Sequence, residues 1–176
     1  MVSMQVEFPN LEQLTLSCIN VSMICHATLT TLSCVENLTE LIIEGCDDLE
    51  YLFSSSMARG LVKLKYLHLN QCKRMKEVIF EEDEEEKGNL IFPQLINLLM
   101  KNLGNLTRFY SGNCIVEFPY LKDLRISNCP ELKGFTPKAV DIDDRNDIHV
   151  LFNEQVIKFI SYIFACIIMI EFNFWN

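Results

Sequence analysis

Residues 64–78 read Leu-Lys-Tyr-Leu-His-Leu-Asn-Gln-Cys-Lys-Arg-Met-Lys-Glu-Val, and this stretch decides the fold of the 176-residue chain. Its frame is L-x-x-L-x-L-x-x-C-x-x-φ-x-x-φ, where φ is apolar. The frame recurs at residues 38–52, 95–109 and 121–135, and a first, irregular copy starts at Leu11. The opening leucines (11, 38, 64, 95, 121) are therefore 27, 26, 31 and 26 residues apart. Such a period predicts a leucine-rich-repeat solenoid, in which each unit supplies one short strand and a return segment.

The alternation inside the frame predicts an α/β solenoid of about five repeats. In x-L-x-L-x the leucines point to the core, and the residues between them point outward. Stacked repeats then form a short parallel sheet on the concave side of an arc, with the return segments on the convex side. One return segment begins with Ser54-Ser55-Ser56, which are N-cap residues, so we expect a short helix up to Leu61. The Phe-Pro pairs at 8–9, 92–93 and 118–119 predict an extended entry to the next strand.

The outward positions form three rows, because parallel strands in register place equivalent residues about 5 Å apart. The first row is Gln13, Glu40, Tyr66, Asn97 and Asp123. The middle row is Thr15, Ile42, His68, Leu99 and Arg125. The third row is Ser17, Glu44, Asn70, Lys101 and Ser127.

The centre of these rows is the candidate binding surface for a protein partner. Aromatic and apolar anchors amid polar residues are typical of interfaces, although single apolar residues also occur on ordinary surfaces. The expected partner-binding residues are Glu40, Ile42, Glu44, Tyr66, His68, Asn70, Asn97, Leu99, Lys101, Asp123 and Arg125. In this interpretation Ile42, Tyr66, His68 and Leu99 are the anchors, and the charged residues set specificity.

The repeat explains the eight cysteines better than disulfides or a metal site do. Cys46, Cys72 and Cys129 occupy one slot of the frame, Cys18 lies one residue before that slot, and Leu103 fills it in the fourth copy. A reduced cysteine is a small buried hydrophobe in such a turn. The chain has no C-x-x-C pair, and its three histidines are not spaced for zinc. We therefore expect no metal and no cofactor.

The net charge and the first nine residues limit the classes of protein to which this chain can belong. The formal net charge is -9, and no stretch of clustered Lys and Arg offers the positive surface that nucleic acid requires. Residues 1–9 lack the basic and apolar regions of a signal peptide, so we expect a cytoplasmic protein. No nucleophile elbow, cysteine–histidine pairing or metal spacing supports an enzyme.

An acidic insertion interrupts the repeats, which we assign to residues 5–136. Residues 81–88 hold six acidic side chains and one lysine, so they contribute -5 of the net charge and explain the long 31-residue spacing. They have neither the alternating ligands of an EF-hand nor a reason for shifted pKa values, so we expect a solvated loop. Residues 137–155 are expected to form a polar linker.

Residues 156–176 are a hydrophobic tail unlike the rest of the chain. Their uncharged core, residues 159–170, is 12 residues long, whereas a bilayer-spanning helix needs about 20. The tail has no leucine, and 14 of its 21 residues are Ile, Phe, Lys, Asn or Tyr, which A and T codons alone can encode. Our hypothesis is that it is translated non-coding sequence, and a tail anchor is the functional alternative. We expect no membrane partner.

Three stretches resemble the repeats of plant intracellular immune receptors, namely residues 8–21, 37–46 and 49–57. They are most similar to the coiled-coil, nucleotide-binding, leucine-rich-repeat class of disease-resistance proteins, and the likeness covers residues 5–155. The resemblance implies repeats that bind a pathogen effector or a host protein and restrain an upstream ATP-dependent switch. This chain has no G-x-x-x-x-G-K-[ST] loop, so nucleotide would act only through a domain that is absent here.

The sequence therefore predicts a non-catalytic recognition module of a truncated plant disease-resistance receptor that acts in defence. Two alternatives stay open. One is a truncated product without function, whose uncapped ends would expose strand edges and core leucines. The other is a leucine-rich-repeat adaptor outside immunity, such as the substrate-reading half of a ubiquitin ligase.

Overall fold

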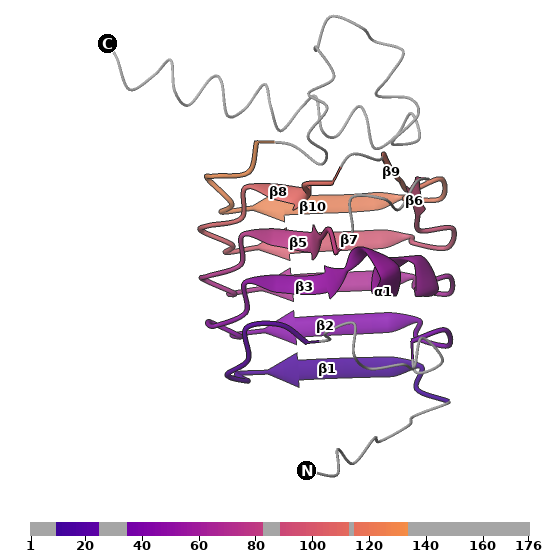
Figure 1. Cartoon of the computed structure of the whole chain (residues 1–176), viewed down its shortest axis with the longest axis horizontal. Coiled ribbons are helices and arrows are strands. Elements are labelled where there is room, and N and C mark those ends of the chain that lie inside the picture. Colours follow the sequence, from indigo (N-terminus) through magenta and orange to yellow (C-terminus); the bar gives the residue numbers. More distant parts are fainter. Residues whose placement is uncertain (1–9, 25–34, 83–88, 113–114, 134–176) are drawn as a thin grey trace, which may run out of the picture.

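The structure is a computed structural model that describes residues 10–24, 35–82, 89–112 and 115–133. Its main element is a five-stranded parallel sheet with the strand order β1-β2-β4-β7-β10. The strands are β1 (Gln13–Ser17), β2 (Glu40–Glu44), β4 (Tyr66–Asn70), β7 (Asn97–Lys101) and β10 (Asp123–Ser127). Figure 1 shows them stacked in sequence order from β1 at the bottom to β10 at the top. The predicted leucine-rich-repeat solenoid is confirmed.

The core is a continuous strip behind this sheet. The second leucine of each frame pairs in register with its equivalents, and three of these, Leu41, Leu67 and Leu98, are at most 1% exposed. The next inward row, from Ile43 through Leu69, is equally buried. Each side chain is covered by its equivalents in the repeats before and after it, so burial here depends on the neighbouring repeats.

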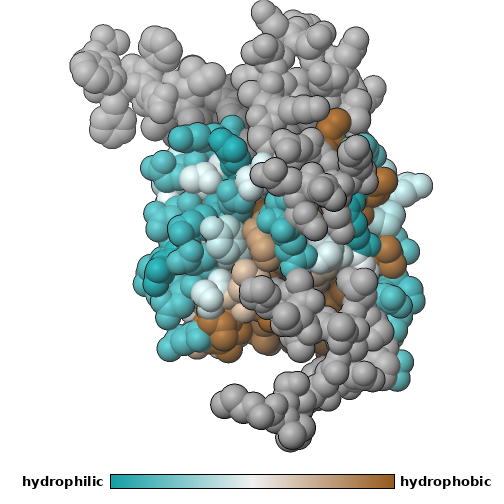
Figure 2. Space-filling view, viewed as in Figure 1, coloured by the Kyte–Doolittle hydropathy of each residue, from teal (hydrophilic) through white to brown (hydrophobic). Residues whose placement is uncertain are grey.

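Burial falls at both ends of this strip. Leu14 and Leu16 of β1 are only partly buried, as are Ile126 of β10 and Leu132 after it. Within the described residues these repeats have a neighbouring strand on one side only. Figure 2 shows hydrophobic residues gathered at the end of the stack where β1 lies. Each terminal repeat therefore gains less from burial than a central one.

The return segments form a second parallel sheet with the order β3-β5-β8. Its strands are β3 (Tyr51–Ser54), β5 (Glu77–Phe80) and β8 (Arg108–Tyr110). The expected short helix is present as α1 (Ser55–Gly60), and Ser54 caps it by accepting a hydrogen bond from the Met57 amide at 3.2 Å. Among the residues described, α1 is the one helix, so the return side is mostly β. Aromatic and β-branched residues such as Val78 and Ile79 favour strands there.

The Phe-Pro pairs do not make the extended entry that the sequence predicts. A short sheet of β6 (Leu90–Ile91) and β9 (Val116–Glu117) comes first. Phe92 and Phe118 then begin β-turns, in which their carbonyls accept hydrogen bonds from Leu95 at 3.3 Å and Leu121 at 3.2 Å. Proline suits the second position of such a turn because its ring fixes φ. The same turn precedes β2 and β4 without proline, so the repeat itself sets this geometry. The pair at 8–9 lies outside the described residues.

The start of the acidic insertion is not the solvated loop that we expected. Glu81 and Glu82 are half-buried. Glu81 accepts a hydrogen bond from the Tyr110 hydroxyl, and Glu82 accepts one from the Ser56 hydroxyl. Residues 83–88 lie outside the described residues, as do the predicted linker 137–155 and the hydrophobic tail 156–176. In the part of the chain that the structure describes, no helix is long and apolar enough to cross a membrane.

Candidate recognition surface

The register of the main sheet assembles the three predicted rows into one surface. We call the outward-pointing side chains of β1, β2, β4, β7 and β10 the sheet face. In its middle row Ile42 pairs with His68, and His68 pairs with Leu99. Tyr66 lies beside this row, between Glu40 and Asn97. Every predicted partner-binding residue lies on the sheet face, on β2, β4, β7 or β10.

One backbone feature ends all five strands at the same point of the repeat. The residue after each strand has a positive φ, near 55° in four repeats and 64° at Gly45. The residues are Cys18, Gly45, Gln71, Asn102 and Asn128. This left-handed conformation is easiest for Gly and is favoured by Asn. It turns the chain inward, so the following residue enters the core. Cys18 occupies the turn position itself and is exposed.

The buried slot after this turn holds the repeated cysteines. Cys46 and Cys72 are fully buried, and both are free thiols, as is Cys129. The Cys72 thiol donates to the Asn70 carbonyl at 3.5 Å, and the Cys129 thiol donates to the Ser127 carbonyl at 3.5 Å. Burial raises the pKa of the Cys72 thiol to about 11, so the thiol is neutral at ordinary pH. The slot is structural, as the sequence predicts.

A ladder of amides fixes one edge of the sheet face. The Asn70 amide nitrogen donates to the Glu44 carboxylate at 3.0 Å. Asn102 donates to the Asn70 side-chain oxygen at 3.1 Å, and Asn128 donates to that of Asn102 at 2.8 Å. The ladder therefore holds Glu44 and Asn70 in place across four repeats, and part of their hydrogen-bonding capacity is already used.

The centre of the sheet face is partly exposed. Tyr66 is 37% exposed, and Ile42, His68 and Leu99 are half-buried. At the β10 end, Arg125 forms an ion pair with Asp123 at 2.9 Å. By contrast, no side-chain ion pair or hydrogen bond joins Glu40 or Lys101 to another described residue. The surface thus offers an apolar centre, an acidic side at β2 and a basic residue on β7.

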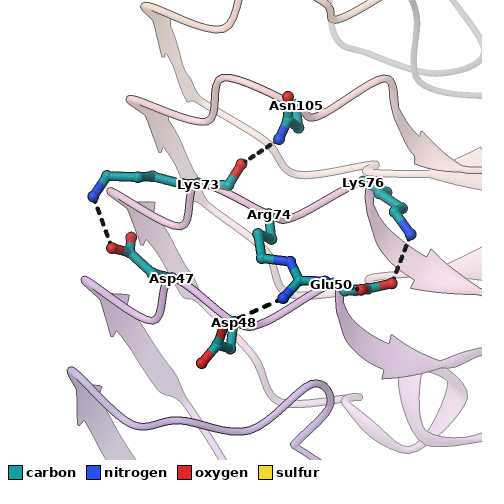
Figure 3. Close-up of polar contacts among 7 residues, drawn as sticks. All are labelled: Asp47, Asp48, Glu50, Lys73, Arg74, Lys76 and Asn105. Atoms are coloured by element: carbon teal, nitrogen blue, oxygen red, sulfur yellow. Dashed lines mark hydrogen bonds and ion pairs between the residues drawn. The ribbon is translucent and has the colours of Figure 1, made fainter.

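A second cluster of charges lies in the turns that follow β2 and β4 (Figure 3). The contacts, 2.7 to 3.4 Å long, join Lys73 to Asp47, Arg74 to Asp48 and Glu50, and Lys76 to Glu50. The hydrogen bond from Lys73 holds the pKa of the Asp47 carboxyl below its usual value, and Lys76 does the same for the pKa of Glu50. These contacts also raise the pKa of each lysine. Exposed pairs of this kind stabilise a fold only slightly.

We did not predict this cluster from the sequence, although the spacing of its opposite charges indicates it. Asp47 and Lys73, Asp48 and Arg74, and Glu50 and Lys76 are each 26 residues apart. That spacing is the distance between the opening leucines of the two repeats. Opposite charges one period apart therefore identify contacts between neighbouring turns in a solenoid. Figure 2 shows hydrophilic residues gathered along this edge, at the left of the view.

The fold and its surface define the class of protein as a leucine-rich-repeat solenoid with an open sheet face. The sequence pattern described as "plant disease resistance protein RPS2-like, leucine-rich repeats" matches residues 10–143. The chain therefore belongs to this family of plant disease-resistance leucine-rich repeats, which confirms the resemblance seen in the sequence.

Two Arabidopsis thaliana proteins are similar to this chain. The putative disease resistance protein At4g19050 is 35% identical over 82 residues, which are 46% of this chain and 7% of that protein. The disease resistance protein RPS4B is 32% identical over 120 residues, which are 61% of this chain and 10% of that protein. The chain thus corresponds to a small part of both relatives. No solved structure matches it.

Proposed function

We propose that this chain is a non-catalytic protein-recognition module of a plant disease-resistance receptor. Its sheet face binds a pathogen effector or a host protein in the cytoplasm. The observation that carries this proposal is the in-register placement of Ile42, His68 and Leu99 on three adjacent strands, with Tyr66 beside them. A cluster of aromatic and apolar side chains with polar surroundings is the usual centre of a binding surface. The names of the relatives favour an immune setting over an adaptor outside immunity.

The size of the sheet face limits how a partner binds. Five strands of five residues cover about 400 Å², from a strand spacing of about 4.8 Å and a rise of about 3.3 Å per residue. A typical specific interface buries about 800 Å² on each partner. A partner that binds tightly therefore also contacts residues beyond the sheet face.

The charged residues contribute to the choice of partner. Glu40 and Glu44 favour a basic group opposite β2, whereas Lys101 favours an acidic group opposite β7. Charges at the rim change association rates and exclude wrong partners more than they increase affinity. The apolar centre then supplies most of the binding free energy.

The test compares two double variants of the full chain in titrations against individually purified effectors and host proteins. Tyr66→Ala with His68→Ala removes two central side chains, and Lys73→Ala with Arg74→Ala is the matched control in the turns. Partners that bind the wild-type chain are expected to lose about tenfold to a hundredfold in affinity with the first variant. The control should keep most of its affinity, because exposed charges in the turns contribute little.

Circular dichroism of both variants checks that the solenoid is intact. Unchanged affinity of the Tyr66/His68 variant for every partner would show that binding takes place elsewhere on the molecule.

A further inference from the structure

The charges of the sheet face are divided along the stack. Glu40 and Glu44 lie on β2, and Lys101 lies on β7, with β4 between these two strands. Ile42 of β2 and Leu99 of β7 are both half-buried and lie in the middle row. One side of β4 is therefore acidic and apolar, and the other is basic and apolar. Such a surface is complementary to itself when the order of the strands is reversed.

We propose that the sheet face binds a second copy of this chain, face to face, about a two-fold axis that runs parallel to β4. This self-association goes beyond the partner proposed above and does not depend on it. The axis leaves β4 opposite its own copy and places β2 of each copy opposite β7 of the other. Both copies then use the same patch, as a closed two-fold interface requires.

The contacts across this interface follow from the register. Glu44 of each copy faces Lys101 of the other, so the dimer contains this pair of opposite charges twice. Ile42 likewise faces Leu99 twice, and His68 faces its own copy at the centre. At the start of the strands, Glu12 faces Lys122, both of which are exposed. Opposite charges therefore meet at two kinds of pair and apolar side chains at a third, and each pair occurs twice in the dimer.

The other two-fold axis in the plane of the face, along the stack, is unfavourable. It exchanges the first and third rows and sets Glu40 of one copy against Glu44 of the other. Like charges in contact are destabilising. With the axis parallel to β4, Lys65, just before the strand, faces Lys65 of the other copy. The long, flexible lysine side chains can turn away from each other there.

The expected association is weak. The sheet face offers about 400 Å² per copy, and interfaces of this size belong to transient complexes. Screening by salt weakens the exposed charge pairs further. Self-association of this strength responds to local concentration, and it covers the same side chains that a foreign partner needs.

The test measures the dimer dissociation constant of the full chain by analytical ultracentrifugation over a concentration series at low salt. Glu44→Lys places a lysine opposite Lys101, and Lys101→Glu places a glutamate opposite Glu44. Each variant alone is expected to lose at least about tenfold in self-affinity. An equimolar mixture of the two should recover association, because every facing pair again has opposite charges. Lys73→Glu, in the turns, is the matched control and should associate like the wild type.

A crosslinking experiment tests the position of the axis. In a Cys18→Ser background, which removes the exposed native thiol of the described part of the chain, His68→Cys places a thiol opposite its own copy. Oxidation should therefore link two chains faster than with Asn105→Cys, whose thiol lies in a turn. A wild-type chain that stays monomeric overturns the proposal, as does a mixture that fails to recover association. Equal crosslinking of the two cysteine variants also overturns it.

Discussion

Replacing Leu67 by alanine tests whether the core is a strip in which each repeat depends on its neighbours. Leu67 lies between Leu41 of β2 and Leu98 of β7, and its exposure is 0%. The change removes three carbon atoms, and about 0.8 kcal/mol per buried methylene gives about 2.4 kcal/mol. The cavity lies between two rigid neighbours that close it only in part, which raises the expected loss to about 3–4 kcal/mol.

The matched control is Leu14→Ala in β1, which removes the same atoms from a position that is only partly buried. Less apolar surface is lost there, and the site is covered by a neighbouring strand on one side within the described residues. We expect a loss of about 1 kcal/mol at this position.

Urea unfolding followed by circular dichroism measures both losses. With a slope of about 1–3 kcal/mol per molar, Leu67→Ala should lower the urea midpoint by about 1–4 M, and Leu14→Ala by about a third of that or less. Equal losses at the two positions would show that burial does not depend on the number of neighbouring repeats.

Three further results are expected. Ser54→Ala should lower the free energy of unfolding by about 1 kcal/mol in urea melts, because α1 loses its N-cap, whereas Ser54→Gly should cost only a few tenths of a kcal/mol. The pKa values of Asp47 and Glu50 are lowered in the folded chain, so their small contribution to stability is present above the ordinary carboxyl pKa and is lost as the pH falls through the folded values. NMR titration of both carboxyls checks this, and unshifted values would contradict it. Alkylation at mildly alkaline pH should modify the exposed Cys18 well before Cys72, whose buried thiol has its pKa raised to about 11. Mass spectrometry of the labelled peptides measures the two rates, and equal rates would contradict the buried slot.

The sequence predicted the sheet correctly because one period controls it. Alternation in x-L-x-L-x identifies the inward leucines, and the constant frame puts Tyr66 and His68 on one strand and Leu99 on the next. Two-residue periodicity with a fixed repeat length leaves one register that buries every leucine. The same rule correctly placed Cys46 and Cys72 in the core, and Cys129 of the last described repeat is partly buried.

The sequence predicted the short helix of the return side but not its strands, because the return segments carry no comparable alternation. Short apolar runs such as Glu77–Phe80 suit a strand or a helix equally well by pattern, and length and neighbours decide between them. By composition, Glu81 is predicted to belong to a solvated acidic run. In the structure, the hydroxyl of Tyr110, 29 residues away in the sequence, donates a hydrogen bond to the Glu81 carboxylate. Such contacts depend on which return segments become neighbours, which composition does not reveal.

The repeat, the inward and outward positions and the order of the strands follow from the sequence alone, because each depends on residues one period apart. The family followed from the resemblance of residues 8–21, 37–46 and 49–57 to known repeats, which the match over residues 10–143 confirms. Which charged side chains contact a neighbouring side chain follows only from the tertiary structure. It pairs Asp123 with Arg125, joins Glu44 to the amide ladder, and leaves Glu40 and Lys101 without a side-chain partner among the described residues. These differences depend on side-chain reach and on the strands that lie next to one another. A hydrogen bond forms only when both groups meet at about 3 Å, and the fold sets that distance.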